Sequence, residues 1–281
     1  MCFRLAVTWV TLHLLFQYSY GQILNKPESV DFDPNTETYY ISNIGGSSGG
    51  FIVVDSKKKT TEVKKEGKGQ YLGIKRYGKY IICAIDQDNT KENGLSDEVA
   101  LYDAKSYKLI KTISIPGAIQ LNDIEVDERG VVYVTDRGAN QVYEVNIVSG
   151  SFNPLLKENN ILTPNGLFYD LKTKLLYICT TNETNNAIYI LDPKSRKIED
   201  KIAIPFSNLD GIIIDKNDNI YVSSWSNDWK SSRILKLGSD KKSISVLMEN
   251  ENGMADIAYD KVNNRILIAC MYKNTIQVLH L

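Results

Sequence analysis

The sequence predicts an all-β fold, a six-bladed β-propeller built from four-stranded antiparallel blades. Three observations carry this prediction. A short motif that has the pattern of a strand recurs six times, the recurrences are almost evenly spaced, and turns rich in Gly, Asn and Asp separate further strand-like segments with no sustained helical periodicity. A strand-rich repeat of roughly 40 to 45 residues is typical of a propeller blade. The structural alternative, a two-layer sandwich, does not require one repeat length throughout.

The six motifs define the innermost strand of each predicted blade. In chain order they are PESVDFD (27–33), YLGIKRY (71–77), LNDIEVD (121–127), PNGLFYD (164–170), LDGIIID (209–215) and MADIAYD (254–260). Their second residues lie at positions 28, 72, 122, 165, 210 and 255, so successive steps are 44, 50, 43, 45 and 45 residues. The surplus in the second unit lies in the polar segment Gln87 to Glu98, which either borders an opening or is a solvated surface insertion.

A second and a third strand follow each motif, but the sixth unit ends at Leu281 after three strands. Its fourth strand must therefore come from elsewhere in the chain. We predict that the N-terminal segment 22–25, QILN, supplies it. Pairing the two ends of the chain in one blade would close the ring and cover an otherwise exposed strand edge.

The N-terminus has the pattern of a secretory signal peptide. Arg4 precedes an apolar run from Leu5 to Phe16, and the small residues Ser19 and Gly21 occupy the positions that a signal peptidase prefers. We therefore predict a leader over residues 1–21 and a single propeller domain over residues 22–281. The protein is expected to be secreted, either outside the cell or into a periplasm, and no later segment is long and apolar enough to predict a membrane helix.

The charge and the cysteines narrow the range of partners. The chain has 33 Lys and Arg against 34 Asp and Glu, a net charge of −1 without long basic runs, so neither nucleic acid nor a membrane surface is an expected partner. Cys83, Cys179 and Cys270 each lie in an apolar run and are expected to be buried. A small-molecule substrate and a monomeric state are expected.

The second residue of each motif predicts a ring of side chains around the propeller axis, because equivalent positions in a closed ring face one region. The ring is Glu28, Leu72, Asn122, Asn165, Asp210 and Ala255. Two carboxylates and two carboxamides are hard oxygen ligands, which suit Ca²⁺ better than a metal that prefers thiolate or imidazole. The alternative is that these Asn and Asp residues only cap local turns.

The ring residues and the stretches PESV, LNDIEVD, PNGL and LDGI resemble the SMP-30, gluconolactonase and luciferin-regenerating family of six-bladed calcium propellers. Their site design is similar to that of squid-type diisopropylfluorophosphatase. The resemblance implies that Glu28, Asn165 and Asp210 bind the divalent metal, and that Asn122 joins them or holds substrate beside it. Gln120 stands where gluconolactonase-type members usually carry an Arg that binds substrate. Gln120 is therefore expected to contact substrate, but specificity for sugar-acid lactones is not implied.

These observations together predict a Ca²⁺-dependent hydrolase, although another hard divalent cation such as Mg²⁺, Mn²⁺ or Zn²⁺ is a candidate. The metal would polarise the carbonyl of a lactone or ester, or the P=O group of an organophosphate. Asp210 is the first candidate for the general base or nucleophile, and Asp123 the second, with a structural role as the alternative for Asp123. His280 is the one His beyond the predicted leader, next to the last residue of the sequence, so a catalytic His-His dyad is excluded.

Two alternatives remain open from the sequence. The first is a non-catalytic propeller that binds a ligand or a protein on its top face, with Ca²⁺ holding the blades together. The second concerns Trp225 and Trp229 in the segment SSWSNDW. These side chains either line the mouth of the pocket or pack between blades.

Overall fold

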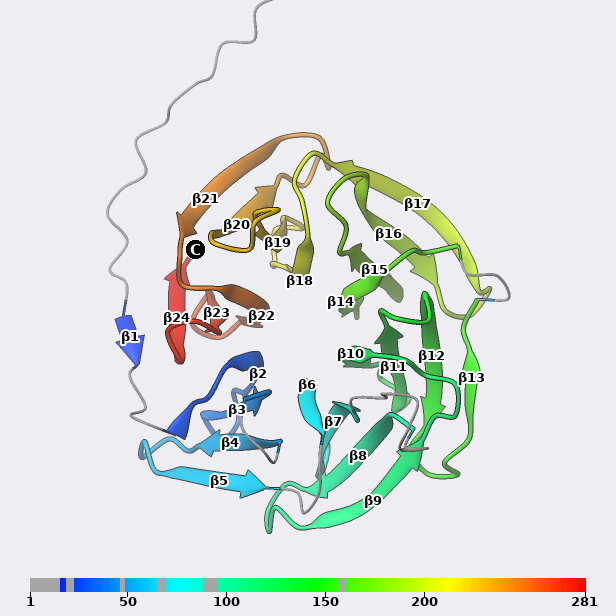
Figure 1. Ribbon diagram of the computed structural model, residues 1–281, viewed down its shortest axis with the longest axis vertical. Helices are drawn as coiled ribbons and strands as arrows, with labels where there is room; N and C mark the ends of the chain where they lie inside the picture. The colour runs from blue at the N-terminus through cyan, green and yellow to red at the C-terminus, as the bar shows by residue number, and fades with distance from the viewer. Residues whose placement is uncertain (1–15, 19–22, 46–48, 65–68, 88–95, 157–159) are drawn as a thin grey trace, which may run out of the picture.

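A computed structural model of the 281-residue chain describes residues 16–18, 23–45, 49–64, 69–87, 96–156 and 160–281. The described strands form six four-stranded antiparallel sheets, arranged as blades around a central axis (Figure 1). The predicted six-bladed β-propeller is therefore confirmed. In the described part of the chain, no helix is long and apolar enough to cross a bilayer.

The strands follow the predicted repeat from the axis outwards. Blade 1 contains β2 (Pro27–Asp33), β3 (Thr38–Asn43), β4 (Gly50–Val54) and β5 (Thr60–Lys64), and blade 2 contains β6 (Gln70–Tyr77), β7 (Tyr80–Asp86), β8 (Glu98–Asp103) and β9 (Leu109–Ser114). Blade 3 contains β10 (Leu121–Val126), β11 (Val131–Asp136), β12 (Gln141–Asn146) and β13 (Phe152–Pro154), and blade 4 contains β14 (Pro164–Asp170), β15 (Leu175–Thr180), β16 (Asn186–Asp192) and β17 (Lys197–Ile204). Blade 5 contains β18 (Leu209–Ile214), β19 (Ile220–Trp225), β20 (Ser232–Leu237) and β21 (Ile244–Asn250), and blade 6 contains β22 (Met254–Asp260), β23 (Arg265–Cys270) and β24 (Thr275–His280).

The fourth strand of blade 6 differs from the predicted one. It is β1 (Phe16–Tyr18), which pairs antiparallel with β24 so that Phe16 lies opposite Val278. Ile23 to Asn25 form no strand, and Gln22 and most of the predicted leader lie outside the described residues. Leu24 is instead buried in an apolar cluster with Ile276 and Val278, which fixes this segment as a connection between blades 6 and 1.

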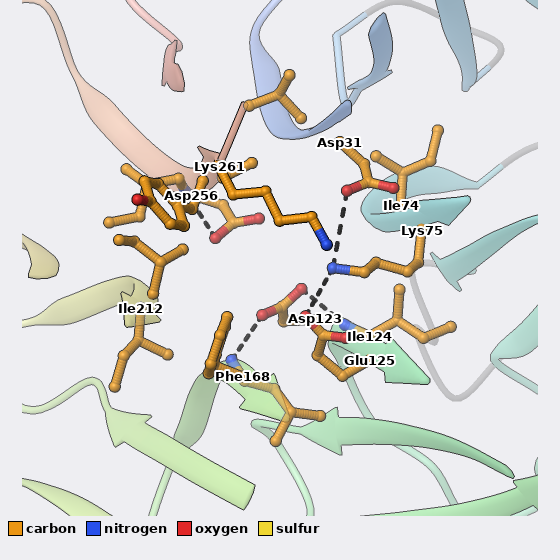
Figure 2. A pocket seen from close by; sticks show the side chains of 16 residues that line it. Asp31, Ile74, Lys75, Asp123, Ile124, Glu125, Phe168, Ile212, Asp256 and Lys261 are labelled. Atoms are coloured by element: carbon orange, nitrogen blue, oxygen red, sulfur yellow. Dashed lines mark hydrogen bonds and ion pairs between the residues drawn. The ribbon is translucent and has the colours of Figure 1, made fainter. Parts of the chain in front are cut away.

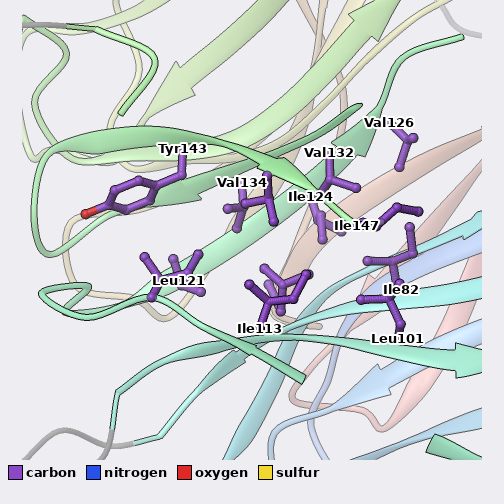
Figure 3. Packing of buried hydrophobic residues seen from close by; sticks show 14 of the residues in the cluster. Ile82, Leu101, Ile113, Leu121, Ile124, Val126, Val132, Val134, Tyr143 and Ile147 are labelled. Atoms are coloured by element: carbon purple, nitrogen blue, oxygen red, sulfur yellow. The ribbon is translucent and has the colours of Figure 1, made fainter. Parts of the chain in front are cut away.

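The hydrophobic core consists of separate clusters in the sheet-to-sheet interfaces of the ring. Figure 3 shows the cluster between blades 2 and 3, where Ile82 and Leu101 face Ile124, Val132 and other apolar side chains. These side chains come from alternate positions of strands in neighbouring blades, as expected for sheets that pack face to face. Burial of each such side chain contributes about 1.5 to 3 kcal/mol, so every blade depends on both of its neighbours.

The loop in the predicted insertion of blade 2 is anchored at its ends. Residues 88–95 lie outside the described ranges, but Asp97 is fully buried and accepts hydrogen bonds from the amides of Gln87 (3.0 Å) and Leu121 (2.9 Å). Asp97 therefore ties the insertion to the innermost strand of blade 3, near the axis.

Candidate functional site

Every innermost strand carries a β-bulge at the same place in the repeat. The register with the second strand shifts between Pro27 and Val30 in blade 1, and the five other blades have the equivalent shift. An extra residue in one strand bends it and changes the direction of its side chains. The predicted ring residue and the residue after it both lie inside this bulge, so the bulge sets which side chains reach the axis.

The amide groups that the bulges free from strand pairing are satisfied by side chains of the second strands. The hydroxyls of Ser42, Thr135 and Ser223 accept hydrogen bonds from the amides of Ser29, Asp123 and Gly211 at 2.8, 2.9 and 2.7 Å. Buried amides need such partners. The same type of hydrogen bond therefore fixes the backbone at the bulges of blades 1, 3 and 5.

The glycines that follow the ring residues allow close approach of neighbouring blades. A Cβ atom on Gly166 would lie 2.0 Å from the carbonyl oxygen of Asp210, and one on Gly211 would lie 2.5 Å from the amide nitrogen of Ile257. Both distances are far below van der Waals contact. The two positions require Gly because the inner strands of blades 4, 5 and 6 nearly touch there.

The predicted site residues gather at one pocket on the axis, with a volume of about 170 Å³. Its lining includes Glu28, Asn122, Asn165 and Asp210, the four predicted metal ligands, together with Gln120, the predicted substrate-binding residue. All four ligand candidates are buried, with at most 9% of the residue exposed. Trp225 and Trp229 also line this pocket, which is called the upper pocket below.

Asn165 presents an unpaired acceptor in the upper pocket. The hydroxyl of Thr181 donates to the carbonyl of Leu209 (2.5 Å), so its oxygen accepts from the Asn165 amide nitrogen Nδ2 (2.6 Å). This chain of donors fixes the orientation of the Asn165 amide. Oδ1 of Asn165 is buried and has no hydrogen-bond partner among the described residues. A buried, unpaired carbonyl oxygen is costly unless a ligand or an ion satisfies it.

Asp210 is held in place by the indole of Trp225. Nε1 of Trp225 donates a 2.7 Å hydrogen bond to Oδ2 of Asp210. Burial raises the pKa of Asp210, while the bonds from Trp225 and Asn165 and the charge of Arg137 lower it. The carboxylate of Asp210 is therefore desolvated and held in a fixed orientation. Its Oδ1 takes no part in the hydrogen bond to Trp225.

Glu28 adds a further carboxyl group to those of Asp210, Asp256 and Asp123 near the axis. Burial raises the pKa of Glu28 well above its usual value, and repulsion from Asp210, Asp256 and Asp123 raises it further, whereas Arg137 lowers it. Carboxylates that repel one another inside a protein favour a bound cation, which relieves the repulsion. The electrostatics of the upper pocket therefore match a site for a positive ion.

The second candidate base, Asp123, lines a different chamber. Its Oδ1 accepts from the amide of Ile124 (2.7 Å) and its Oδ2 from the amide of Leu167 in blade 4 (2.6 Å). The carboxylate thus links two blades just below the ring and is not among the residues that line the upper pocket. This geometry supports a catalytic role for Asp123 less than for Asp210.

The chamber below the ring has a volume of about 160 Å³ and is rich in charged groups (Figure 2). Nζ of Lys75 lies 2.7 Å from Oε1 of Glu125 and 3.7 Å from Oδ1 of Asp31. Burial alone would lower the pKa of Lys75, but these two carboxylates raise it above its usual value. Lys75 is therefore a charged member of a partly buried ion-pair network, which is a structural role.

Two residues of the axial region are not among those predicted from the sequence. Asp256 follows Ala255 in the bulge of blade 6, and its Oδ2 accepts from the Ser29 hydroxyl of blade 1 (2.5 Å). It occupies the same place in the repeat as Asp123, a signal that was readable in the motif MADIAYD. Arg137 lines the upper pocket from the turn after β11, where no repeat position pointed to it.

The donor set of the upper pocket fits a hard divalent cation. In the described part of the chain, no group of three or more His, Cys, Asp or Glu side chains is arranged to hold a metal by itself. The predicted set has two carboxylates, and the amide oxygens of Asn165 and Asn122 would supply the other ligands. Such all-oxygen, mixed sets are typical of Ca²⁺, whose remaining positions water or substrate can fill. The unpaired Oδ1 of Asn165 agrees with this assignment.

Comparison with solved structures shows the same fold at low sequence identity. A catalytically inactive variant of virginiamycin B lyase from Staphylococcus aureus, solved with quinupristin, superimposes with a TM-score of 0.69 at 14% identity, covering 96% of this chain and 100% of that one. A luciferin-regenerating enzyme gives a TM-score of 0.69 at 16% identity, with 96% of each chain covered. A chain of a nidogen/laminin complex gives 0.65 at 12% identity, covering 87% of this chain and 94% of that one. At such identities the likeness shows the fold alone.

Comparison at the level of sequence gives the family. No curated protein sequence matches the chain. The family model described as the SMP-30/Gluconolactonase/LRE-like region matches residues 27–253, which include all four predicted metal ligands and five complete innermost strands. The chain therefore belongs to the SMP-30/gluconolactonase/LRE-like family.

Proposed function

We propose that this protein is a secreted, metal-dependent hydrolase that cleaves a lactone or a related ester at the upper pocket. The observation that carries the proposal is the buried, unpaired Oδ1 of Asn165 in a pocket that Glu28 and Asp210 also line. A cation in this position would satisfy that oxygen and neutralise the two carboxylates. Family membership supports the same type of site.

The proposed ligands of Ca²⁺ are Glu28, Asn165 and Asp210, and Asn122 either joins them or holds substrate. When bound, such a cation supplies Lewis-acid polarisation of a carbonyl or P=O oxygen. Asp210 then acts as general base towards a water molecule or attacks the substrate itself. The bond from Trp225 keeps Asp210 oriented throughout.

The rest of the pocket would position the substrate. Gln120 lies in the lining beside Asn122 and can donate or accept a hydrogen bond. The backbone carbonyl of Gln120 accepts a hydrogen bond from the amide of Arg137 (2.9 Å), which holds Gln120 and Arg137 together. We propose that Gln120 and Arg137 orient the reacting group of the substrate towards the metal ligands.

The second candidate function is a non-catalytic propeller that binds a ligand or a protein on its top face. Solved structures with this fold include a lyase, a luciferin-regenerating enzyme and a chain of a nidogen/laminin complex, so the fold does not choose between an enzyme and a binding protein. The upper pocket offers one well-placed carboxylate for chemistry and no His, which is the observation that favours a binding protein.

The deciding experiment is a calorimetric titration of metal-stripped protein with Ca²⁺, run in parallel on Asp210→Ala and on the exposed control Asp200→Ala. Saturable binding by the wild type and the control, with loss in Asp210→Ala, supports the axial site. A screen of lactones, esters and phosphotriesters with and without chelator then tests hydrolysis. Binding without any chelator-sensitive turnover would favour the binding protein, and no binding would refute the metal site.

A further inference from the structure

One side of the upper pocket is an aromatic wall, defined here as Trp225, Trp229 and Tyr272. The ring centroids of Trp225 and Trp229 lie 5.6 Å apart, and those of Trp225 and Tyr272 lie 5.3 Å apart with the rings near perpendicular. Trp225 is buried, whereas 41% of Trp229 and 49% of Tyr272 are exposed. All three line the pocket, so the wall runs from the metal ligands outwards to the mouth.

The aromatic wall is fixed in place by local structure. The hydroxyl of Tyr272 donates to the carbonyl of Trp229 (2.9 Å), and the amide of Trp229 donates to the carbonyl of Ser226 (2.9 Å). Trp229 has a φ of 58°, a left-handed conformation that is unfavourable for a bulky side chain and persists where surrounding contacts impose it. A Cβ on Gly253 would lie 2.8 Å from the Tyr272 ring and 3.0 Å from the Trp225 ring, so Gly is needed behind the wall.

Arg137 lies in blade 3, and the aromatic wall belongs to blades 5 and 6, which are across the ring in Figure 1. Asp136 shapes the turn that carries Arg137, because its carboxylate accepts from the amides of Ile119, Gln120 and Ala139 at 3.0, 3.0 and 2.9 Å. None of the described residues forms a hydrogen bond or an ion pair with the guanidinium of Arg137. A planar guanidinium that lines a pocket without such a partner can donate hydrogen bonds to a carboxylate or another anionic group of a ligand.

The remaining lining is mostly apolar. Of the ten lining residues other than the four predicted metal ligands, six are apolar or aromatic: Ile44, Leu72, Trp225, Trp229, Met271 and Tyr272. The four polar ones are Gln70, Gln120, Arg137 and Thr181, and Thr181 already uses its hydroxyl in the Asn165 network. A polyhydroxylated sugar acid would leave several hydroxyls unpaired against such a surface, and unpaired buried polar groups weaken binding.

We propose that the upper pocket selects substrates in which a flat aromatic ring carries an anionic or strongly accepting group, with the ring on the aromatic wall and that group at Arg137. This inference names the substrate class of the proposed hydrolase and rests on that function for its catalytic meaning. The binding preference comes from the wall and Arg137 and does not require catalysis, while Glu28 and Asp210 line the same pocket and their charges act on Arg137. Arg137 and Tyr272 are then specificity residues, distinct from the metal ligands.

Intrinsic fluorescence tests the binding preference directly. The chain has three Trp residues, and Trp225 and Trp229 are the two beyond the predicted leader, so the emission reports on the pocket. We would titrate metal-free protein with 3-phenylpropanoate, with its saturated analogue 3-cyclohexylpropanoate and with gluconate. We expect saturable quenching by 3-phenylpropanoate at a concentration at least tenfold below that needed for either of the others. Equal or tighter binding of gluconate would overturn the proposal without any variant.

Two variants separate the contributions. Arg137→Gln and Tyr272→Ala are each expected to weaken binding of 3-phenylpropanoate about tenfold, while Arg196→Gln, which alters an exposed pair with Glu144, leaves it unchanged. Unaltered binding by both variants, with thermal melts equal to that of the wild type, would also overturn the proposal. Adding Ca²⁺ distinguishes the two levels of inference, since failure to bind Ca²⁺ would remove the hydrolase and leave the aromatic selectivity standing.

Discussion

Replacing Asp256 with Asn is expected to stabilise the metal-free protein at neutral pH. Asp256 is buried beside the ring, and its pKa is raised to about 7, first by burial and also by Asp210, against the lowering effect of bonds from Ser29 and Ile257. An Asn side chain can keep the bond from the amide of Ile257 through its oxygen, and its NH₂ group can donate to the Ser29 hydroxyl, which reverses the direction of that bond. The substitution therefore removes a charge without removing the contacts.

The sign follows from the direction of the shift. Because the folded-state pKa lies above the unfolded value, the folded chain binds more protons between these two values, and the contribution of Asp256 to stability falls as the pH rises through that window. From a reference value of 3.8 and a folded value of about 7, at about 1.36 kcal/mol per pKa unit, Asp256 lowers the free energy of unfolding by about 2 to 3 kcal/mol between about pH 5 and about pH 7.5.

Urea denaturation with chelator present, at these two pH values, measures this difference. The wild type should lose stability towards neutral pH relative to Asp256→Asn, and the variant should be the more stable protein at about pH 7.5. Asp200→Asn, an exposed position, serves as the control and should follow the wild type. An identical change with pH in the wild type and in Asp256→Asn would refute the reasoning that burial and neighbouring carboxylates strain this group.

Three further predictions concern the upper pocket and its frame. Asp210→Asn should abolish chelator-sensitive turnover with the fold intact, as judged by circular dichroism, and a fully active variant would remove Asp210 from its proposed role. Trp225→Phe should weaken Ca²⁺ affinity in calorimetry by about tenfold to a hundredfold, because residues that orient a ligand have effects of this size, and unchanged affinity would show that the 2.7 Å bond to Asp210 does not matter for binding. Gly166→Ala should lower the unfolding midpoint severely or prevent folding, since its Cβ would lie 2.0 Å from a backbone oxygen, and a melt equal to that of the wild type would contradict the close packing of blades 4 and 5.

The repeat carried most of what was predictable from the sequence. Equivalent positions of a closed ring face one axis, so the motifs sufficed to bring Glu28, Asn165 and Asp210 to one pocket. The same logic reaches Asp256, which stands one position after Ala255 in the sixth motif. What the motifs cannot give is the contribution of turns, since these differ from blade to blade.

Arg137 and the closing strand illustrate that limit. The position of Arg137 depends on a turn organised by the carboxylate of Asp136, and such a turn leaves no periodic trace. The prediction places the closing strand in residues 22–25 because they follow the predicted leader, whereas Phe16 to Tyr18 form the pair with β24. Leu24 satisfies an apolar cluster equally well as part of a connection, and its apolar character alone could not distinguish the two roles.

Because all six innermost strands have the same bulge, the backbone around the axis does not depend on which side chain stands at the ring position. There are six equivalent ring positions, and Leu72 and Ala255 occupy two of them with side chains that carry no donor atom. A substitution at either of these two positions can add an oxygen donor, and a substitution at one of the other four can remove one, with the same blades around the axis. The scaffold can therefore move between metal preferences, or lose its metal altogether, by point substitutions on one ring, and diversification of this kind needs no change in topology.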